Sequence, residues 1–241
     1  MILLIDIGNH RLKWATADGG PPQAGTPLEH DGDPAAALER VDAADASAAW
    51  VSHVVGAEVE PGLVKQIKER FGCDTRFART EEECDGLRVA YAEPQRLGVD
   101  RWLGMFALWS ELHAPFVVVN SGTALTCDAV DDGGMHLGGL IAPGLTTAQK
   151  GVLDATRFAV RPQGANYTAG LGKDTESCVR QGALHACAGA IERAARLAAG
   201  ARFITGGDAP SLLPHVGRDW QWRPLLVLEG LLALARLEGA A

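Results

Sequence analysis

Short apolar runs that end in polar, glycine-containing turns recur along this chain and predict buried β-strands. Residues 1–8 (MILLIDIG) and 116–123 (FVVVNSGT) are continuous apolar runs rich in Ile and Val, a pattern typical of strands buried on both faces. Each run is followed by a polar turn and a second β-like stretch, over 11–17 and over 125–130. Both halves therefore begin with a glycine-containing hairpin, and the pattern predicts two similar units.

Helical and extended segments alternate in the rest of the chain. A stripe of apolar residues at helical spacing predicts a helix over 101–113, and Gly72 is placed to end a helix over 61–71. The other expected elements are helices over 34–46, 146–154, 174–199 and the C-terminal Leu-Ala run, and strands over 50–55, 137–141 and 202–205. Such alternation indicates an α/β protein.

Pro115 interrupts the chain between the two hairpin-led halves. We expect a domain boundary there, with an N-terminal half over 1–114 and a C-terminal half over 115–241. A ligand is then expected in the cleft between the halves, a usual location for binding sites.

Charge and composition exclude several function classes. With 22 basic and 30 acidic residues the net charge is −8, which disfavours general nucleic-acid binding because phosphate backbones are repelled. No apolar run reaches the roughly 18 residues that span a bilayer, and the N-terminus has no basic, cleavable leader pattern. Five scattered cysteines without a CxxC pair favour reduced, mostly buried thiols. We therefore expect a cytoplasmic protein with no membrane partner.

The first candidate site is the hairpin over 6–13 (DIGNHRLK). Glycine at the turn lets a phosphate approach backbone N–H groups, and a carboxylate closing a strand can hold Mg²⁺ through water. An ordinary tight hairpin with an Asx-turn explains the same residues. The expected phosphate-binding residues here are Asp6, Ile7, Gly8, Asn9, His10, Arg11, Leu12 and Lys13.

The second hairpin repeats this logic over 120–128 (NSGTALTCD), where Gly122 and Thr123 can hold phosphate oxygens from the opposite side. A plain hairpin is again the alternative. Two such turns in matching positions carry more weight than either alone. Glycines at 138–139, 144 and 206–207 offer a smooth wall for a flat base, although each also fits a simple turn.

The segment 91–102 (YAEPQRLGVDRW) forms a loop that leads into a predicted helix. Asp100 at the helix start is either a cap or a carboxylate that accepts a substrate hydroxyl proton. Arg101 beside it can bind a carboxylate or another anion.

Taken together and in this order, the segments resemble the type III pantothenate kinases of the acetate kinase/Hsp70/actin-like superfamily. The resemblance rests on D6-x-G-N9 with Lys13, on L97-G-V-D-R101, on G122-T-A124 with Thr126 and Asp128, on Gly138-Gly139 with Ile141, Pro143 and Gly144, and on T205-G-G-D208. It covers nearly the whole chain. It implies two ribonuclease H-like (actin-like ATPase) halves with a nucleotide cleft between them.

The resemblance also implies an activity and its residues. The activity is ATP-dependent phosphorylation of pantothenate to 4′-phosphopantothenate, the first step of coenzyme A biosynthesis, with Mg²⁺ and an activating K⁺ or NH₄⁺. It implies Asp100 as the catalytic base and Asp6 as the Mg²⁺ residue. It implies a homodimer in which Thr175 reaches the neighbouring subunit's site. The implied pantothenate-binding residues are Tyr91, Gly98, Val99, Asp100, Arg101 and Thr175.

Two departures from the family pattern leave alternatives open. Asn120 stands where the family usually has the Asp linked to the monovalent cation, and His10 replaces a common Thr or Ser. A neutral amide still offers an oxygen but removes one charge. The alternatives are a non-catalytic accessory or regulatory protein that keeps the fold, and another small-molecule kinase of the same superfamily.

Overall fold

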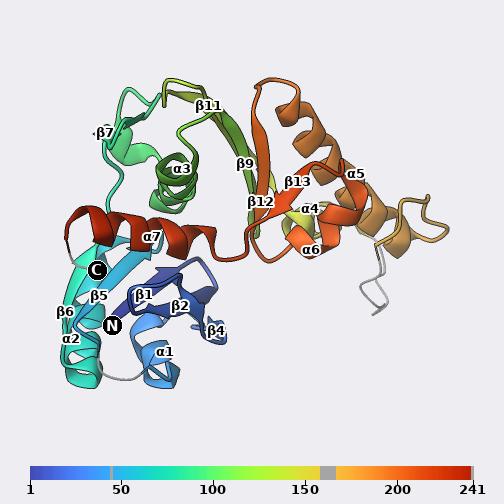
Figure 1. Cartoon of the computed structure of the whole chain (residues 1–241). Coiled ribbons are helices and arrows are strands. Elements are labelled where there is room, and N and C mark those ends of the chain that lie inside the picture. The colour runs from blue at the N-terminus through green and yellow to red at the C-terminus, as the bar shows by residue number, and fades with distance from the viewer. Residues whose placement is uncertain (44–45, 158–166, 240–241) are drawn as a thin grey trace. The chain divides into compact units, whose positions relative to one another are not determined.

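The computed structural model describes residues 1–43, 46–157 and 167–239 and divides the chain into two compact units (Figure 1). The first unit joins Met1–His113 to Leu225–Ala241, and the second is Ala114–Pro224. The first unit is left, and the second begins, at Ala114, next to the boundary expected between residues 114 and 115. The C-terminal segment was expected in the second half, but it belongs to the first unit because its helix packs on the first sheet and on helix α3 (Val99–Leu112).

The predicted helices and strands of the first unit begin close to where the sequence places them. They are β1 (Ile2–Ile7), β2 (Arg11–Ala17), α1 (Pro34–Ala37), β5 (Ala48–His53), α2 (Glu60–Phe71) and α3 (Val99–Leu112), together with the C-terminal helix α7 (Leu226–Leu237), whose bounds were not predicted. The elements that were not predicted are the short strands β3 (Gln23–Ala24), β4 (Leu28–Glu29), β6 (Asp74–Phe77), β7 (Glu83–Cys84) and β8 (Leu87–Arg88) and 3-10 turns at Leu38–Arg40, Ala57–Val59 and Pro94–Arg96.

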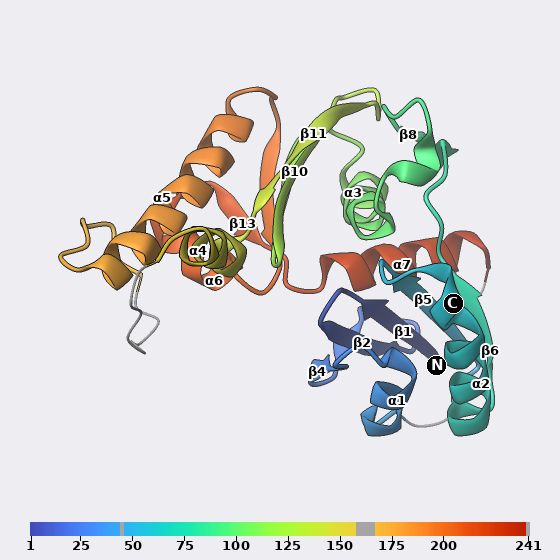
Figure 2. The same ribbon diagram turned by 180° about the vertical axis from the view of Figure 1, so that it is seen from behind.

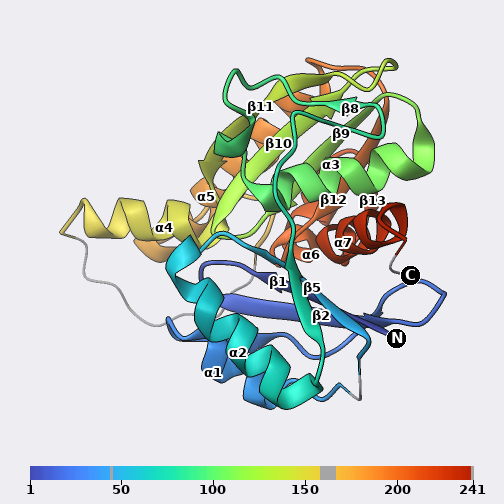
Figure 3. The ribbon, with the colours of Figure 1, turned by 90° about the vertical axis from the view of Figure 1, so that its left-hand side faces the viewer.

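The first unit is a sheet with helices on both faces. Its strand order is β3-β2-β1-β5-β6, with β4 also paired to β2, and β1 runs parallel to β5 but antiparallel to β2. Figure 3 shows α1 and α2 side by side against this sheet, and their core includes Leu3, Ile5 and Ile7 of β1. Because side chains alternate along a strand, Asp6 points to the opposite face, where α7 and α3 pack.

The second unit repeats this design. Its sheet has the order β11-β10-β9-β12-β13; β10 is antiparallel to both β11 and β9, and β9, β12 and β13 run parallel. Figure 2 shows α5 and α4 covering one face of the sheet. The elements are β9 (Phe116–Ser121), β10 (Ala124–Val130), β11 (His136–Pro143), α4 (Leu145–Asp154), α5 (Thr175–Ala195), β12 (Ala201–Thr205), α6 (Ala209–Leu212) and β13 (Trp220–Trp222), with a 3-10 turn at Leu213–His215.

The equivalent strand orders confirm the prediction of two similar α/β units. The helix expected over 34–46 is shorter than predicted: α1 ends at Ala37, a 3-10 turn follows, and Val41 adopts an extended backbone with its side chain fully buried in the core. Residues 44 and 45 of that prediction lie outside the described residues. The helix expected over 61–71 is confirmed as α2, which ends at Gly72 in the left-handed region, with φ +67°.

All five cysteines are free thiols, and four of them are buried. Among the described residues, no helix combines the length and the apolar character that crossing a bilayer requires.

Candidate functional site

The end of β1 in the first unit carries a buried carboxylate, that of Asp6. Its neighbours across the sheet are Lys13 on β2 and Ser52 on β5. The Ser52 hydroxyl, itself fully buried, donates a hydrogen bond of 2.8 Å to Asp6 Oδ1. Burial raises the pKa of Asp6, while the Lys13 charge and the Ser52 hydrogen bond act in the opposite direction.

The turn that follows β1 is closed by backbone hydrogen bonds. Gly8 N–H donates to Arg11 C=O at 2.9 Å, and Asn9 and His10 are exposed at the tip. A Cβ built at Gly8 would meet only the Arg11 carbonyl oxygen, at 3.6 Å, which is ordinary contact. Packing within the unit therefore does not demand glycine at this position.

The structure separates the predicted residues 6–13 into two groups. The side chains of Ile7 and Leu12 are fully buried in the core on the α1 and α2 side, so these side chains are not available to a ligand. Any contact of these two residues with a phosphate would be made by the backbone, because β-strand alternation turns their side chains inward. Arg11 points to solvent and reaches Glu29 at 3.4 Å.

Asp100 lies in the first turn of α3, which begins at Val99 with Gly98 at the N-cap position. The helix therefore starts two residues before the predicted Arg101, and Asp100 is not the cap residue. Burial raises the pKa of the Asp100 carboxyl, and the negative charge of Asp6 raises it further; the Arg101 backbone N–H and guanidinium oppose this shift. The two carboxylates thus interact within the first unit.

Tyr91 and Arg101 form a pair beside Asp100. Arg101 is buried, with 7% of its surface exposed, and its Nη1 donates to the Tyr91 hydroxyl at 3.0 Å. The guanidinium also lies 5.9 Å from the centroid of the Tyr91 ring. The structure therefore gathers Tyr91, Asp100 and Arg101, predicted as substrate residues from a loop and a helix, at the start of α3.

The second unit has its own turn, between β9 and β10. Gly122 N–H donates to Ala124 C=O at 3.0 Å, and the Thr123 carbonyl accepts from Gly144 N–H at 3.1 Å and from the Thr147 hydroxyl at 2.6 Å. A Cβ at Gly144 would lie 1.8 Å from the Gly122 carbonyl oxygen, so this position requires glycine for close approach. A Cβ at Gly122 itself would have no neighbour within 4 Å.

Two further predicted residues belong to the second unit. Asn120 is half-buried on β9, paired with Thr126 and Thr205 of the adjacent strands. Thr175 is the first residue of α5 and is exposed; Asp174 before it caps the helix through a 2.7 Å bond from Ser177 N–H. That backbone N–H lowers the pKa of Asp174.

Sequence reasoning missed Ser52 and His30. Ser52 had a readable signal, because the carboxyl ends of two adjacent parallel strands meet at one edge of a sheet, and Ser52 lies there beside Asp6. His30 had none, since it is a lone histidine between Glu29 and Asp31. Its ring Nε2 lies 2.8 Å from the Gly8 carbonyl oxygen.

Solved structures with a similar backbone define the fold class of this protein. A Campylobacter jejuni protein described as a Baf family transcriptional activator superposes with a TM-score of 0.64 and 20% identity, over 99% of this chain and all of that one. A ROK family glucokinase from Streptomyces griseus superposes with a TM-score of 0.51 and 13% identity, over 98% of this chain and 99% of that one. At these identities the likeness concerns the fold, which is the actin-like ATPase fold of two ribonuclease H-like halves.

Sequence relatives narrow the class to one family. Residues 2–197 match the family model of the type III pantothenate kinases. The type III pantothenate kinase of Thiobacillus denitrificans is 35% identical over 98% of this chain and 97% of its own length, and that of Nitrosococcus oceani is 33% identical over 98% and 94%. This chain belongs to the type III pantothenate kinase family.

Proposed function

We propose that this chain transfers the γ-phosphoryl group of ATP to the primary hydroxyl of pantothenate, forming 4′-phosphopantothenate for coenzyme A biosynthesis. Membership of the family supports the reaction. The observation that carries the proposal is the pair of interacting carboxylates of Asp6, which is buried, and Asp100, which is half-buried, with Lys13 opposite Asp6 on the next strand. Phosphoryl transfer requires such charges for positioning and for neutralisation rather than for covalent chemistry.

Each unit contributes ligands for the phosphates of ATP in this proposal. In the first unit they are the backbone at Gly8, the Asn9 amide and the Lys13 ammonium group. In the second unit they are the Gly122 N–H and Thr123. The free space around both turn glycines supports this assignment, since neither is filled by a neighbouring side chain of its own unit.

Asp100 is the proposed catalytic base. It orients the pantothenate hydroxyl and takes its proton as the oxygen bonds to the γ-phosphorus and the bond to ADP breaks. A carboxyl with a raised pKa accepts that proton more readily than an ordinary aspartate. Arg101, with Tyr91, is the proposed partner of the pantothenate carboxylate, because a buried guanidinium binds carboxylates through paired hydrogen bonds.

The residues present fit the use of Mg²⁺ with ATP. Mg²⁺ keeps most of its waters and takes one or two carboxylates, and Asp6 has an oxygen besides the one that Ser52 contacts. Over 1–43, 46–157 and 167–239, no group of three or more His, Cys, Asp or Glu residues is arranged to hold a metal ion. Bound Mg²⁺ would neutralise charge on the β- and γ-phosphates. Asn120, a neutral oxygen donor, is the proposed position for K⁺ or NH₄⁺.

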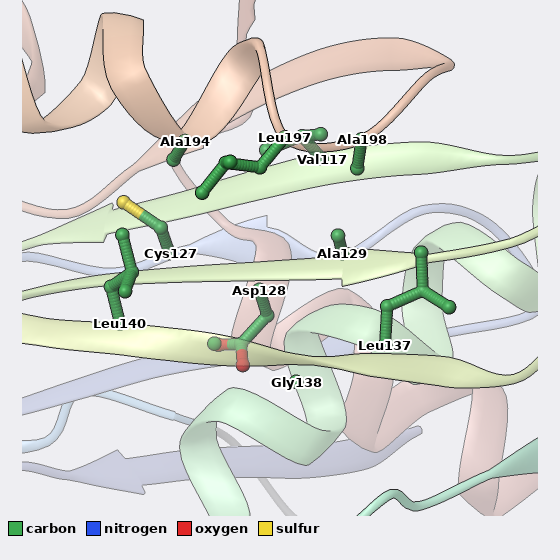
Figure 4. Close-up of a pocket in the computed structure, with 11 residues that line it drawn as sticks. Val117, Cys127, Asp128, Ala129, Leu137, Gly138, Leu140, Ala194, Leu197 and Ala198 are labelled. Atoms are coloured by element: carbon green, nitrogen blue, oxygen red, sulfur yellow. The ribbon is translucent and has the colours of Figure 1, made fainter.

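We further propose that the protein acts as a homodimer to which Thr175 of each copy contributes. Exposed apolar side chains in the second unit support an association surface. Leu137 and Leu197 are 55% and 64% exposed, and with Leu140 they border a pocket of about 230 Å³ between β11 and the end of α5 (Figure 4).

The test is an assay of ADP release with and without pantothenate, in K⁺, NH₄⁺ and Na⁺ buffers. Pantothenate-dependent release, with a phosphorylated product, is the expected result, and faster release in K⁺ or NH₄⁺ supports the cation proposal. ADP release with another hydroxylated acceptor but not with pantothenate would instead indicate a different small-molecule kinase. Nucleotide binding without turnover of any acceptor would favour an accessory protein.

A further inference from the structure

His30 contacts the turn after β1 from outside the proposed site. It lies between β4 and α1 in the first unit, and only 5% of its surface is exposed. Its backbone N–H donates to His10 C=O at 3.2 Å, and its ring Nε2 lies 2.8 Å from Gly8 C=O. One residue therefore holds carbonyl groups at both sides of Asn9.

The contacts of the His30 ring define its tautomer. Gly32 N–H can only donate, and it donates to Nδ1 at 3.3 Å, so Nδ1 carries a lone pair. The Gly8 carbonyl can only accept, so Nε2 carries the hydrogen. A neutral imidazole satisfies both partners at once.

A tight turn fixes His30 in this orientation. Asp33 N–H donates to His30 C=O at 2.6 Å, and the two residues between them, Asp31 and Gly32, have φ of +45° and +90°. Two successive positive φ angles are typical of a type I′ turn. Asp33 then caps α1 by accepting Ala36 N–H at 3.0 Å, so the turn is joined directly to a helix of the core.

Holding these carbonyls determines where the adjacent N–H groups point. In a planar trans peptide the C=O and the following N–H are antiparallel, and no peptide bond among the described residues is cis. The Gly8 carbonyl shares its peptide with Asn9 N–H, and the His10 carbonyl shares its peptide with Arg11 N–H. Both N–H groups are therefore directed away from His30, as donors for an anion bound on the other side of the turn.

We propose that His30 is a positioning residue for phosphate binding, which orients the Asn9 and Arg11 N–H groups by holding the Gly8 and His10 carbonyls. It would not touch the nucleotide. This inference rests on the proposed function only in taking the turn after β1 as the phosphate site.

Two conservative variants separate this role from general packing. In His30→Gln the side-chain amide can replace the Nε2–H donor to Gly8, whereas in His30→Asn the shorter amide can replace only the Nδ1 contact to Gly32. We expect His30→Asn to weaken ADP binding, measured by calorimetry, by about three- to tenfold, the range for one lost neutral hydrogen bond. The KM for ATP should rise by a similar factor while the KM for pantothenate stays unchanged. His30→Gln should stay within about twofold of the parent chain.

The control is His113→Asn, at the end of α3 in the same unit, where φ is +44° and Asn is well tolerated. It should bind ADP as the parent chain does, and thermal denaturation should show all three variants folded. Unchanged ADP affinity in His30→Asn, equal losses in both His30 variants, or a parent chain that does not bind ADP would overturn the inference. A parent chain that binds ADP but does not phosphorylate pantothenate would contradict only the proposed function.

Discussion

The turns after β1 and after β9 occupy equivalent places in two sheets of the same strand order, but different groups hold them. The first turn follows the carboxylate of Asp6, faces Lys13 across the hairpin and is braced by a histidine side chain. The second follows the neutral Asn120, and its Thr123 carbonyl is held by Gly144 N–H and the Thr147 hydroxyl at the start of α4.

This difference suggests that the two units, although they share one strand order, have different roles. Both turns expose backbone near a glycine that has free space around it, so both suit phosphate binding. The charged groups to which we assign phosphoryl transfer, Asp6, Lys13 and Asp100, all belong to the first unit. We therefore expect changes in the first unit to alter catalysis, and changes at the second turn to alter binding and folding.

The largest expected effect is that of Asp100→Asn. Replacing the proposed base should lower kcat by about 10²–10⁴-fold, since that is the usual contribution of a general base. Steady-state assays with saturating ATP and pantothenate measure it. Asp33→Asn, at a helix cap where Asn serves equally well, is the matched control. A folded Asp100→Asn variant with near-parental kcat would remove Asp100 from the mechanism.

The pH profile of the parent enzyme tests the same carboxylate. Asp100 must be ionised to accept a proton, so activity should be present above its pKa and lost as the pH falls through it. Because burial and the Asp6 charge raise this pKa, the acid limb should lie above the value of about 4 for an ordinary aspartate. An acid limb at or below that value would contradict the proposed environment.

The two glycines Gly8 and Gly144 should respond differently to Ala. Gly8→Ala meets no tight protein contact, so it should stay as stable as the parent but bind ADP about 10- to 100-fold more weakly, if a charged ligand uses that backbone. Gly144→Ala forces the Gly122 carbonyl to move and should lose about 1–3 kcal/mol of unfolding free energy. Denaturant unfolding and calorimetry measure both. A Gly8→Ala chain that binds ADP normally would show that the first turn does not contact phosphate.

A smaller effect is expected for Ser52→Ala, which removes the hydrogen bond to Asp6. Loss of the roughly 1 kcal/mol that this hydrogen bond contributes corresponds to a roughly three- to tenfold drop in kcat/KM for ATP. If Ser52 acts through Asp6, the same substitution should have no further effect in an Asp6→Ala chain, which has no side-chain oxygen to accept the Ser52 hydroxyl, measured by its affinity for ADP. Ser110→Ala, which removes another hydroxyl from the first unit, is the control. Independent losses at positions 6 and 52 would contradict the coupling.

Much of the fold could be predicted because apolar residues follow different patterns along the sequence in buried parallel strands and in amphipathic helices. β2 and α2 occur almost where the pattern places them, and Gly72 ends α2 as expected. The C-terminal helix was assigned to the wrong half, since an apolar helix carries no sign of which sheet it will cover. The short strands β4 and β13 have too few residues for a readable alternation.

Candidate site residues could be proposed where chemistry is concentrated in a motif. Asp6, Asp100 and Arg101 were proposed from residue type and position; all three belong to the first unit, and their roles stay predictions. The direction of each side chain was not predicted, and the structure shows that those of Ile7 and Leu12 lie in the core. His30 could not be found, because its role depends on a turn that brings it back to Gly8 from 22 positions away.

The most direct test of the proposed phosphate binding by both turns is an amide NMR titration of the isotope-labelled chain with ADP. We predict that the Asn9 and Arg11 resonances of the first turn and the Gly122 and Thr123 resonances of the second shift together, with one common Kd. Shifts confined to one turn, or two different Kd values, would contradict the claim that both units bind the phosphates of a single nucleotide.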